Sequence, residues 1–113
     1  MKELLINTLL TLGYPVKLQG SIEKNEKYPE SFFTYWNNNT DDGSHYNNSP
    51  VNYVWDFDVN FYSEDFELVN TELLNAKEEL QENGFIISGK GYDVASDEPT
   101  HTGRGMQVLK IEN

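Results

Sequence analysis

Two aspartates on one predicted strand are the residues of this chain best placed to do chemistry. In residues 52–63, NYVWDFDVNFYS, aromatic and apolar side chains alternate with polar ones. Successive side chains of a strand point to opposite faces. Asp56 and Asp58 therefore share one face, about 7 Å apart at ~3.3 Å of rise per residue. A carboxylate pair of this kind suits general acid–base catalysis, a metal site or an acidic surface.

A solvated or interface face explains the Asp56 and Asp58 pattern with the fewest assumptions. Acid–base catalysis by two carboxylates requires environments that push their pKa values apart, and the surrounding sequence offers no group that would do so. Alternating Asp and Asn residues are what the polar face of a half-buried strand contains. We therefore expect an acidic surface at Asp56 and Asp58, with no catalytic residue.

A calcium loop is the nearest match to a metal site, and it fails at its last ligand. With Gly43 at the sixth position of such a loop, Asn38, Thr40 and Asp42 fall at positions one, three and five. Position twelve requires a bidentate glutamate, and Ser49 stands there. The segment predicts a turn-rich polar loop, and we expect neither a metal nor a cofactor.

The two histidines, His45 and His101, both fall in predicted polar loops. Ser96 and Asp97 lie close enough in sequence to His101 to suggest a catalytic triad, but nucleophilic catalysis also needs an oriented base and an oxyanion hole. No G-x-S-x-G elbow is present. Glu98 with His101 supplies only two zinc ligands. We expect two surface histidines and no enzyme activity.

Arg104 is the single arginine of the chain and stands between two glycines. A guanidinium on an acidic protein seeks a carboxylate, either within its own chain or on a neighbouring subunit. Arg104 and His101 are therefore the candidates for inter-subunit contacts, against the simpler interpretation of plain surface residues.

Length and charge restrict the class of protein. The chain has 113 residues, no cysteine and a formal net charge of −11, which fits one domain over residues 1–113. The absence of cysteine excludes disulfides and zinc–thiolate sites and fits a reducing cytosol. So acidic a chain is not expected to bind phosphates of nucleic acid or anionic membranes. Its apolar N-terminus predicts an amphipathic helix, not a signal peptide or a membrane span.

Two helices are predicted from apolar spacing and end signals. The first covers residues 2–13, with Leu5, Leu9 and Leu12 on one face and Gly13 as its end. The second begins after Ser63 or Asp65, either of which can cap it, and runs to about Asn83 before Gly84. Its apolar stripe has alternating spacings of three and four and consists of Phe66, Val69, Leu73, Ala76 and Leu80.

Strands account for most of the remaining chain. The strand predictions are residues 16–22, 31–36, 52–63, 85–94 and 106–111, with polar loops at 37–50 and 95–105. The resulting order is α-β-β-β-α-β-β. Strands adjacent in sequence favour an antiparallel sheet, so we expect an α+β fold with four to five antiparallel strands and both helices packed on them.

The second predicted helix is the most acidic segment. Residues 64–82 contain seven acids against one base, Lys77, and so carry −6 of the net charge. Its last acids oppose the helix dipole, at a cost of a few tenths of a kcal/mol each. A solvated helix face accounts for them, but a surface past which DNA must slide would also tolerate them. The candidate channel-facing acids are Asp56, Asp58, Glu72, Glu78, Glu79 and Glu82.

The order and length of these elements resemble a known family. A short helix leads to the Pro-led strand YPVKLQG, then to KYPESFFTYW, the aromatic strand YVWDFDVNFYS, the helix ELVNTELLNAKEELQENGF and a closing pair that ends GRGMQVLKIEN. This order over nearly the whole chain resembles the tail terminator or tail-completion proteins of long-tailed bacteriophages. It is also similar to small structural proteins encoded among the head–tail genes of phages and prophages of low-GC Gram-positive bacteria.

The resemblance implies an α+β subunit of a homo-oligomeric, hexameric ring that caps the tail tube and docks the DNA-filled head. Its partners would be other copies of the chain, the tail-tube protein and a head-side connector protein. It implies a place in the tail or neck of the virion, reached from the host cytoplasm during assembly. It implies no enzyme activity and no cofactor, and the net charge separately argues against sequence-specific nucleic-acid binding and against a membrane.

Two other hypotheses remain open. The first is an acidic binding module, similar to a DNA mimic, that occupies the phosphate site of a basic protein. The second is a neighbouring neck role, as an adaptor or stopper. An enzyme is the least favoured class, because it would need a pocket with convergent polar groups and shifted pKa values.

Overall fold

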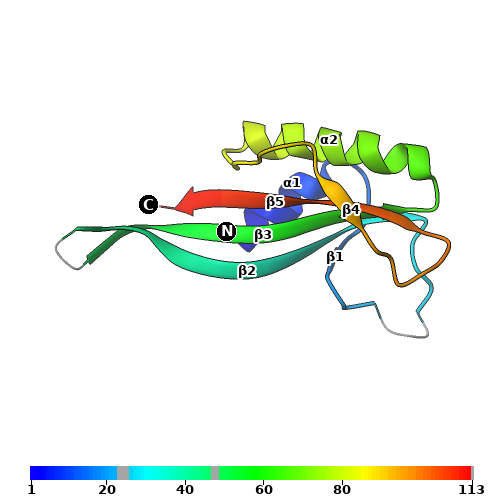
Figure 1. Ribbon diagram of the computed structural model, residues 1–113, viewed down its shortest axis with the longest axis horizontal. Helices are drawn as coiled ribbons and strands as arrows, with labels where there is room; N and C mark the ends of the chain where they lie inside the picture. The colour runs from blue at the N-terminus through cyan, green and yellow to red at the C-terminus, as the bar shows by residue number, and fades with distance from the viewer. Residues whose placement is uncertain (23–25, 47–48, 113) are drawn as a thin grey trace.

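The computed structural model describes residues 1–22, 26–46 and 49–112, with the backbone alone for 39–46 and 49–52. Two helices and five strands follow one another in the predicted order (Figure 1). Their bounds are α1 (Lys2–Leu10), β1 (Val16–Leu18), β2 (Ser31–Tyr46), β3 (Ser49–Ser63), α2 (Phe66–Glu82), β4 (Tyr92–Val94) and β5 (Thr102–Glu112). The α+β class is therefore confirmed.

The strands form one sheet in the order β1-β2-β3-β5-β4. The pairs β2–β3, β3–β5 and β4–β5 are antiparallel, but β1 runs parallel to β2, with Val16 opposite Phe33. The prediction of a purely antiparallel sheet is thus wrong for one pair. Twelve residues separate the end of β1 at Leu18 from the start of β2 at Ser31, which is long enough for the connection that a parallel pair needs.

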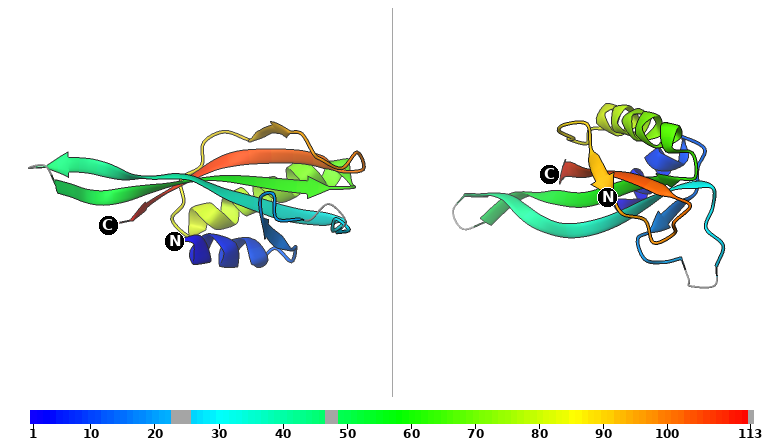
Figure 2. Two further views of the ribbon diagram at one scale, coloured as in Figure 1. Left: turned by 90° about the horizontal axis from the view of Figure 1, so that it is seen from below. Right: turned by 45° about the vertical axis from the view of Figure 1, so that its right-hand side comes forward.

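Both helices cover the same face of the sheet (Figure 2). Beneath them, aromatic residues of β2 and β3 meet the buried leucines of both helices. The largest side chains of this core are Phe33, Phe57, Phe61, Leu5, Leu9, Leu73 and Leu80. We call the opposite side of the sheet the open face. Within the described ranges, neither helix combines the length and apolar character that a membrane crossing needs.

The ends of α2 confirm the predicted helix signals. Asp65 is the N-cap, and its Oδ1 accepts a 3.0 Å hydrogen bond from the backbone N–H of Glu67. At the other end Gly84 has a φ of 89°, and the Phe85 N–H donates to the Leu80 carbonyl at 3.0 Å. That bond, with the left-handed glycine, is a Schellman motif.

The predicted apolar faces are correct except at two positions. The first helix ends at Leu10, not at Gly13, so Leu12 lies beyond it and is half-buried. In α2 the residues Val69, Leu73, Ala76 and Leu80 are buried, but Phe66 is 70% exposed. Phe66 is the first residue of the helix, where the chain has only just left the end of β3. A spacing rule cannot tell at which turn a helix begins to cover the sheet.

The predicted polar loop at residues 37–50 is wrong. β2 continues through it to Tyr46 and pairs with β3 from Ser49 onward, so the two strands form one long hairpin. The pairing is irregular, with register shifts between Asn37 and Asn39 and again near Ser44. Asn, Asp and Gly favour turns in isolation, but in this hairpin backbone pairing with β3 overrides that local preference.

The remaining strands differ from prediction mainly in length. The first predicted strand, 16–22, ends at Leu18. In the region 85–94 only Tyr92–Val94 forms a strand, with a single further bridge from Ile86 to Leu109. The last strand begins at Thr102, so the predicted loop at 95–105 is shorter by four residues. The closing pair itself, β4 with β5, is confirmed.

Candidate functional site

Glycines in β5 shape the open face. A Cβ atom at Gly105 would lie 2.1 Å from the Oδ1 atom of Asn60, and one at Gly103 would lie 2.6 Å from the ring of Tyr62. Both positions would also meet Val94 of β4, at 3.1 and 2.8 Å. Because these two residues lack side chains, Asn60 and Tyr62 of β3 lie close against the backbone of β5.

Asp56 and Asp58 share the open face, as their spacing predicts. Gln107 of β5 donates hydrogen bonds from Nε2 to both carboxylate oxygens of Asp56, at 3.2 and 3.1 Å. Tyr92 lies near enough for both acids to act on it. Burial raises the pKa of the Tyr92 hydroxyl, and the charges of Asp58 and Asp56 add to that effect. The pair therefore forms a half-buried acidic strip.

The four acids predicted on α2 do not share a surface with that strip. Glu78 and Glu82 are exposed on the side of the helix that faces away from the sheet, whereas Glu72 and Glu79 are half-buried on its flank. Glu72 approaches Tyr14, where burial and then the Glu72 charge raise the pKa of the hydroxyl. The α2 acids are thus separated from Asp56 and Asp58 by the core, so the six candidates cannot all face one channel.

Arg104 finds its carboxylate within the chain. Its Nη1 atom lies 2.8 Å from Oδ1 of Asp93, the residue directly opposite it on β4. Its Nη2 atom donates to the backbone carbonyl of Lys90 at 3.0 Å. These two contacts join β4 and the segment before it to β5. An additional role for Arg104 between subunits stays a prediction.

His101 is not a surface histidine, so that prediction is wrong. Its side chain is 8% exposed and packs against the rings of Tyr28 and Phe32, with centroids 5.6 and 5.9 Å away. Its Nε2 atom lies 2.8 Å from the carbonyl oxygen of Pro29, and its Nδ1 atom lies 2.9 Å from the hydroxyl of Thr100. Both ring nitrogens are occupied inside one subunit, which argues against the predicted inter-subunit contact.

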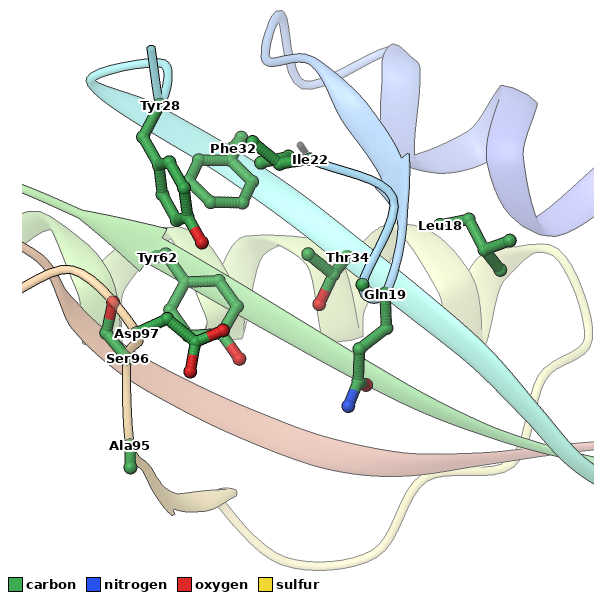
Figure 3. A pocket seen from close by; sticks show the side chains of 11 residues that line it. Leu18, Gln19, Ile22, Tyr28, Phe32, Thr34, Tyr62, Ala95, Ser96 and Asp97 are labelled. Atoms are coloured by element: carbon green, nitrogen blue, oxygen red, sulfur yellow. The ribbon is translucent and has the colours of Figure 1, made fainter. Parts of the chain in front are cut away.

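A pocket of about 290 Å³ opens beside these aromatic residues. Its walls come from segments far apart in the sequence (Figure 3). Gln19 follows β1, Tyr28 precedes β2, Thr34 lies on β2, Tyr62 on β3, and Asp97 in the connection from β4 to β5. Ser96 lines the pocket beside Asp97, so the fold brings an amide, four hydroxyls and a carboxylate to one hollow.

The polar groups at the base of this pocket make only long hydrogen bonds or none. The Nδ2 atom of Asn60 lies 3.5 Å from both Oε1 of Gln19 and the hydroxyl of Tyr62, at the limit of a hydrogen bond. Thr34 is 5% exposed, and its buried hydroxyl has no partner among the described residues. It lies near the Tyr62 hydroxyl and weakly opposes the rise of that pKa, without reaching hydrogen-bond geometry.

Acidic side chains set the electrostatics of the pocket. Burial raises the pKa of Tyr28, and the charges of Asp97 and Glu98 raise it further. Burial is also the largest cause of the raised pKa of Tyr62, to which Asp97 contributes. Both hydroxyls therefore stay protonated at neutral pH. Among the described residues, no three acidic or histidine side chains gather as a metal site would require.

No protein-family model matches this chain, and no curated protein matches it. Function is therefore inferred from the residue pattern and from the geometry.

The pocket residues Gln19, Tyr28, Thr34 and Tyr62 carried no signal that sequence patterns could detect. Each is an ordinary residue of a strand or connection, and only the parallel placement of β1 beside β2 brings Gln19 near Asn60. The sequence pattern indicates Asp97 only as part of an apparent triad with His101. In the structure His101 instead binds the carbonyl of Pro29.

Proposed function

We propose that this chain is a structural subunit of a phage head–tail connection, similar to a tail terminator, that assembles into a homo-oligomeric ring. The number of subunits that the resemblance implies is six. The observation that carries this proposal is the long β2–β3 hairpin, which extends past the end of β5 (Figure 1). Its neighbours would be the tail-tube protein and a head-side connector in the virion.

The hairpin provides one of two incomplete sheet edges. β1 pairs with β2 only over Phe33–Tyr35, and no described strand adjoins the outer side of residues 40–46. We call residues 43–46 and 49–52 the projecting ribbon, because the pairing of β3 with β5 ends at Tyr53 opposite Glu112. Two strands alone are marginally stable in water, so the ribbon is suited to stabilisation by a neighbouring subunit.

The opposite side of the sheet provides the second incomplete edge. β4 covers β5 only over residues 103–105, and beyond it the described chain adds the single bridge from Ile86 to Leu109. A ring needs two different surfaces on each subunit that complement each other. The β2 edge with its ribbon and the β5 edge meet this requirement, because they differ in length and lie on opposite sides of the sheet.

In such a ring we expect the open face to line the channel and the two helices to lie on the outside. A sheet that curves around an axis has less room on its inner side, and both helices occupy the other face (Figure 2). This arrangement gives the channel role to Asp56 and Asp58 and removes it from the α2 acids. Carboxylates that line a channel repel the phosphates of DNA, so DNA would pass without binding.

The exposed side of α2 favours the acidic binding module as a second candidate. Glu78 and Glu82 face solvent there, and the amino group of Lys77 is engaged by the carbonyl of Gly89. A cationic surface could dock on this side of the helix. A persistently monomeric protein that binds a basic partner, with affinity that falls steeply as salt rises, would favour this candidate.

Molecular mass by light scattering, across protein concentration and salt, tests the ring, with negative-stain images of the heaviest species. Subunits that each carry a charge of −11 repel one another, so added salt should promote assembly. Closed rings with a central hole would support the proposal. A monomer at every concentration and salt, both alone and with tail tubes, would contradict it.

A variant with a shortened hairpin tests whether ring formation needs the projecting ribbon. Asp42 and Tyr53 are directly paired, so Asn-Gly in place of residues 43–52 closes the hairpin with a two-residue turn. The sheet and core should stay folded, and rings should be lost. If the protein is instead an acidic binding module that acts through α2, the shortened variant should still bind its basic partner, because that helix is unchanged.

A further inference from the structure

The pocket beside Tyr28 and Tyr62 lies on the open face, at the end of the sheet away from the projecting ribbon, and has the features of a binding site. Its volume of about 290 Å³ lies at the lower end for ligand pockets, about 300 to 1,000 Å³. It therefore suits a compact group such as one side chain or a small metabolite. Its location, under the connection from β4 to β5, is away from both the projecting ribbon and the exposed side of α2.

The base of the pocket has hydrogen-bond acceptors in need of donors. Thr34 is 95% buried, and its hydroxyl has no partner among the described residues. The Oε1 atom of Gln19 and the hydroxyl oxygen of Tyr62 share a single distant donor, Nδ2 of Asn60, 3.5 Å from each. Buried polar groups are normally satisfied. A ligand that donates several hydrogen bonds would satisfy this base.

The negative charge around the pocket favours a ligand whose hydrogen-bond donors are cationic. Asp97 lines the pocket and Glu98 follows it, and none of the described lining residues is basic. Two bases adjoin lining residues in the sequence: Lys17, which pairs with Thr34 across β1 and β2, and Lys27, which lines a separate hollow with Glu30 and Glu64. Neither is a lining residue of the pocket. The aromatic rings of Tyr28, Phe32 and Tyr62 complete the wall. Carboxylate, acceptor oxygens and aromatic rings are the groups that recognise organic cations.

We propose that this pocket binds an alkylammonium group, with Asp97 at the charged end and the hydroxyls of Thr34 and Tyr62 as acceptors. An ammonium has three donors and no acceptor, and the oxygen atoms at the base of the pocket lack close donors. Its aliphatic stem would lie against Phe32 and Tyr28. The group can belong to a free small amine or to a lysine side chain of a protein partner, and both present the same chemistry.

NMR titration of the full chain with n-butylammonium chloride tests the site, against equal concentrations of sodium chloride. Backbone amides of Gln19, Thr34 and Asp97 should shift in a saturable way, with a Kd of about 1–10 mM for so small a ligand. Uncharged n-butanol should produce no saturable shift. Equal binding of butanol, or no saturable shift with butylammonium, would overturn the proposal.

Two variants and a control identify the contacts. Asp97→Asn should raise the Kd about fivefold, as expected for one partly exposed ion pair, and Thr34→Val should raise it about threefold. Glu67→Gln removes the same charge from exposed α2 and should leave the Kd unchanged. The amide spectrum itself reports whether each variant is folded. An unchanged Kd in folded Asp97→Asn would overturn the proposal.

A lysine-containing peptide, acetyl-Gly-Lys-Gly-amide, distinguishes the two sources. If the peptide shifts the same amides as butylammonium, the pocket accepts a lysine side chain and a protein partner is supported. If butylammonium alone binds, the ligand is a free amine. The site does not depend on ring formation, because all its residues come from one subunit, so loss of rings in the shortened hairpin should leave this binding intact.

Discussion

At the scale of single residues, the open face depends on two positions without side chains. Gly105 is the more restrictive, because a Cβ there would overlap Oδ1 of Asn60 at 2.1 Å. Real Cβ atoms do not approach oxygen so closely, so either Asn60 or the β3–β5 pairing would have to shift. The glycine therefore makes room for the Asn60 amide, which lies 3.5 Å from Gln19 at the pocket.

Gly105→Ala should lower the free energy of unfolding by about 1–3 kcal/mol, the usual cost of overpacking. Chemical denaturation measures it. In an Asn60→Ala background the same change should cost less, because the overlapping amide is gone and only the 3.1 Å contact with Val94 remains. Equal costs in the two backgrounds would show that Asn60 is not what Gly105 accommodates.

Tyr62 links the pocket to stability at high pH. Burial raises the pKa of its hydroxyl in the folded protein, above the value of about 10 expected when unfolded. Its stabilising contribution is therefore fully present below pH about 10 and is lost as pH rises through the folded pKa. Tyr62→Phe should make the fall in urea midpoint between pH 9 and 11 shallower. An unchanged slope would contradict this assignment.

Residue patterns alone could place Asp56 and Asp58 on one face, but they could not reveal the pocket. The alternation in 52–63 is a local signal, since neighbouring side chains determine it. Gln19, Thr34, Tyr62 and Asp97 meet only after four segments are placed in one sheet and its connections. His101 was misjudged for the same reason, because its burial comes from Pro29 and Phe32, distant in sequence.

At the scale of elements, helix α2 was the most predictable part of the fold. Its apolar spacing, the acidic cap and Gly84 are all local, and Asp65 and Gly84 act where their types predict. β2 was the least predictable, because residues 37–46 have a loop-like composition and become a strand only by pairing with β3. The parallel direction of β1 could not be predicted, because the residues of a three-residue strand do not show which strand it pairs with or in which direction.

Asp65→Ala tests the cap of α2. Loss of the bond to the Glu67 N–H should lower the free energy of unfolding by about 1 kcal/mol, within the usual 0.5–2 kcal/mol for such caps. Chemical denaturation again provides the measurement. Glu64→Ala removes the same charge from the adjacent exposed residue without removing a side-chain cap. If both variants lose equal stability, charge near the helix start and not capping would explain the effect.

At the scale of the whole molecule, shape and charge act together. The described chain measures 52 × 28 × 22 Å along its principal axes, because the hairpin extends the sheet in one direction (Figure 1). Its net charge of −11 opposes any self-association. In the proposed ring, edge-to-edge contacts would have to overcome this repulsion, which is greatest where acids from all subunits converge near the axis.

Neutralising the acidic strip should therefore promote assembly more than neutralising the outer helix. In Asp56→Asn/Asp58→Asn, each subunit loses two charges from the proposed channel, and rings should form at lower salt than for the unmodified protein. Glu78→Gln/Glu82→Gln loses two charges from the exposed side of α2 and should shift the salt midpoint less. Light scattering across a salt series compares the two. A larger shift from the α2 variant would place that helix nearer the axis and the open face outside, reversing the proposed orientation of the subunit.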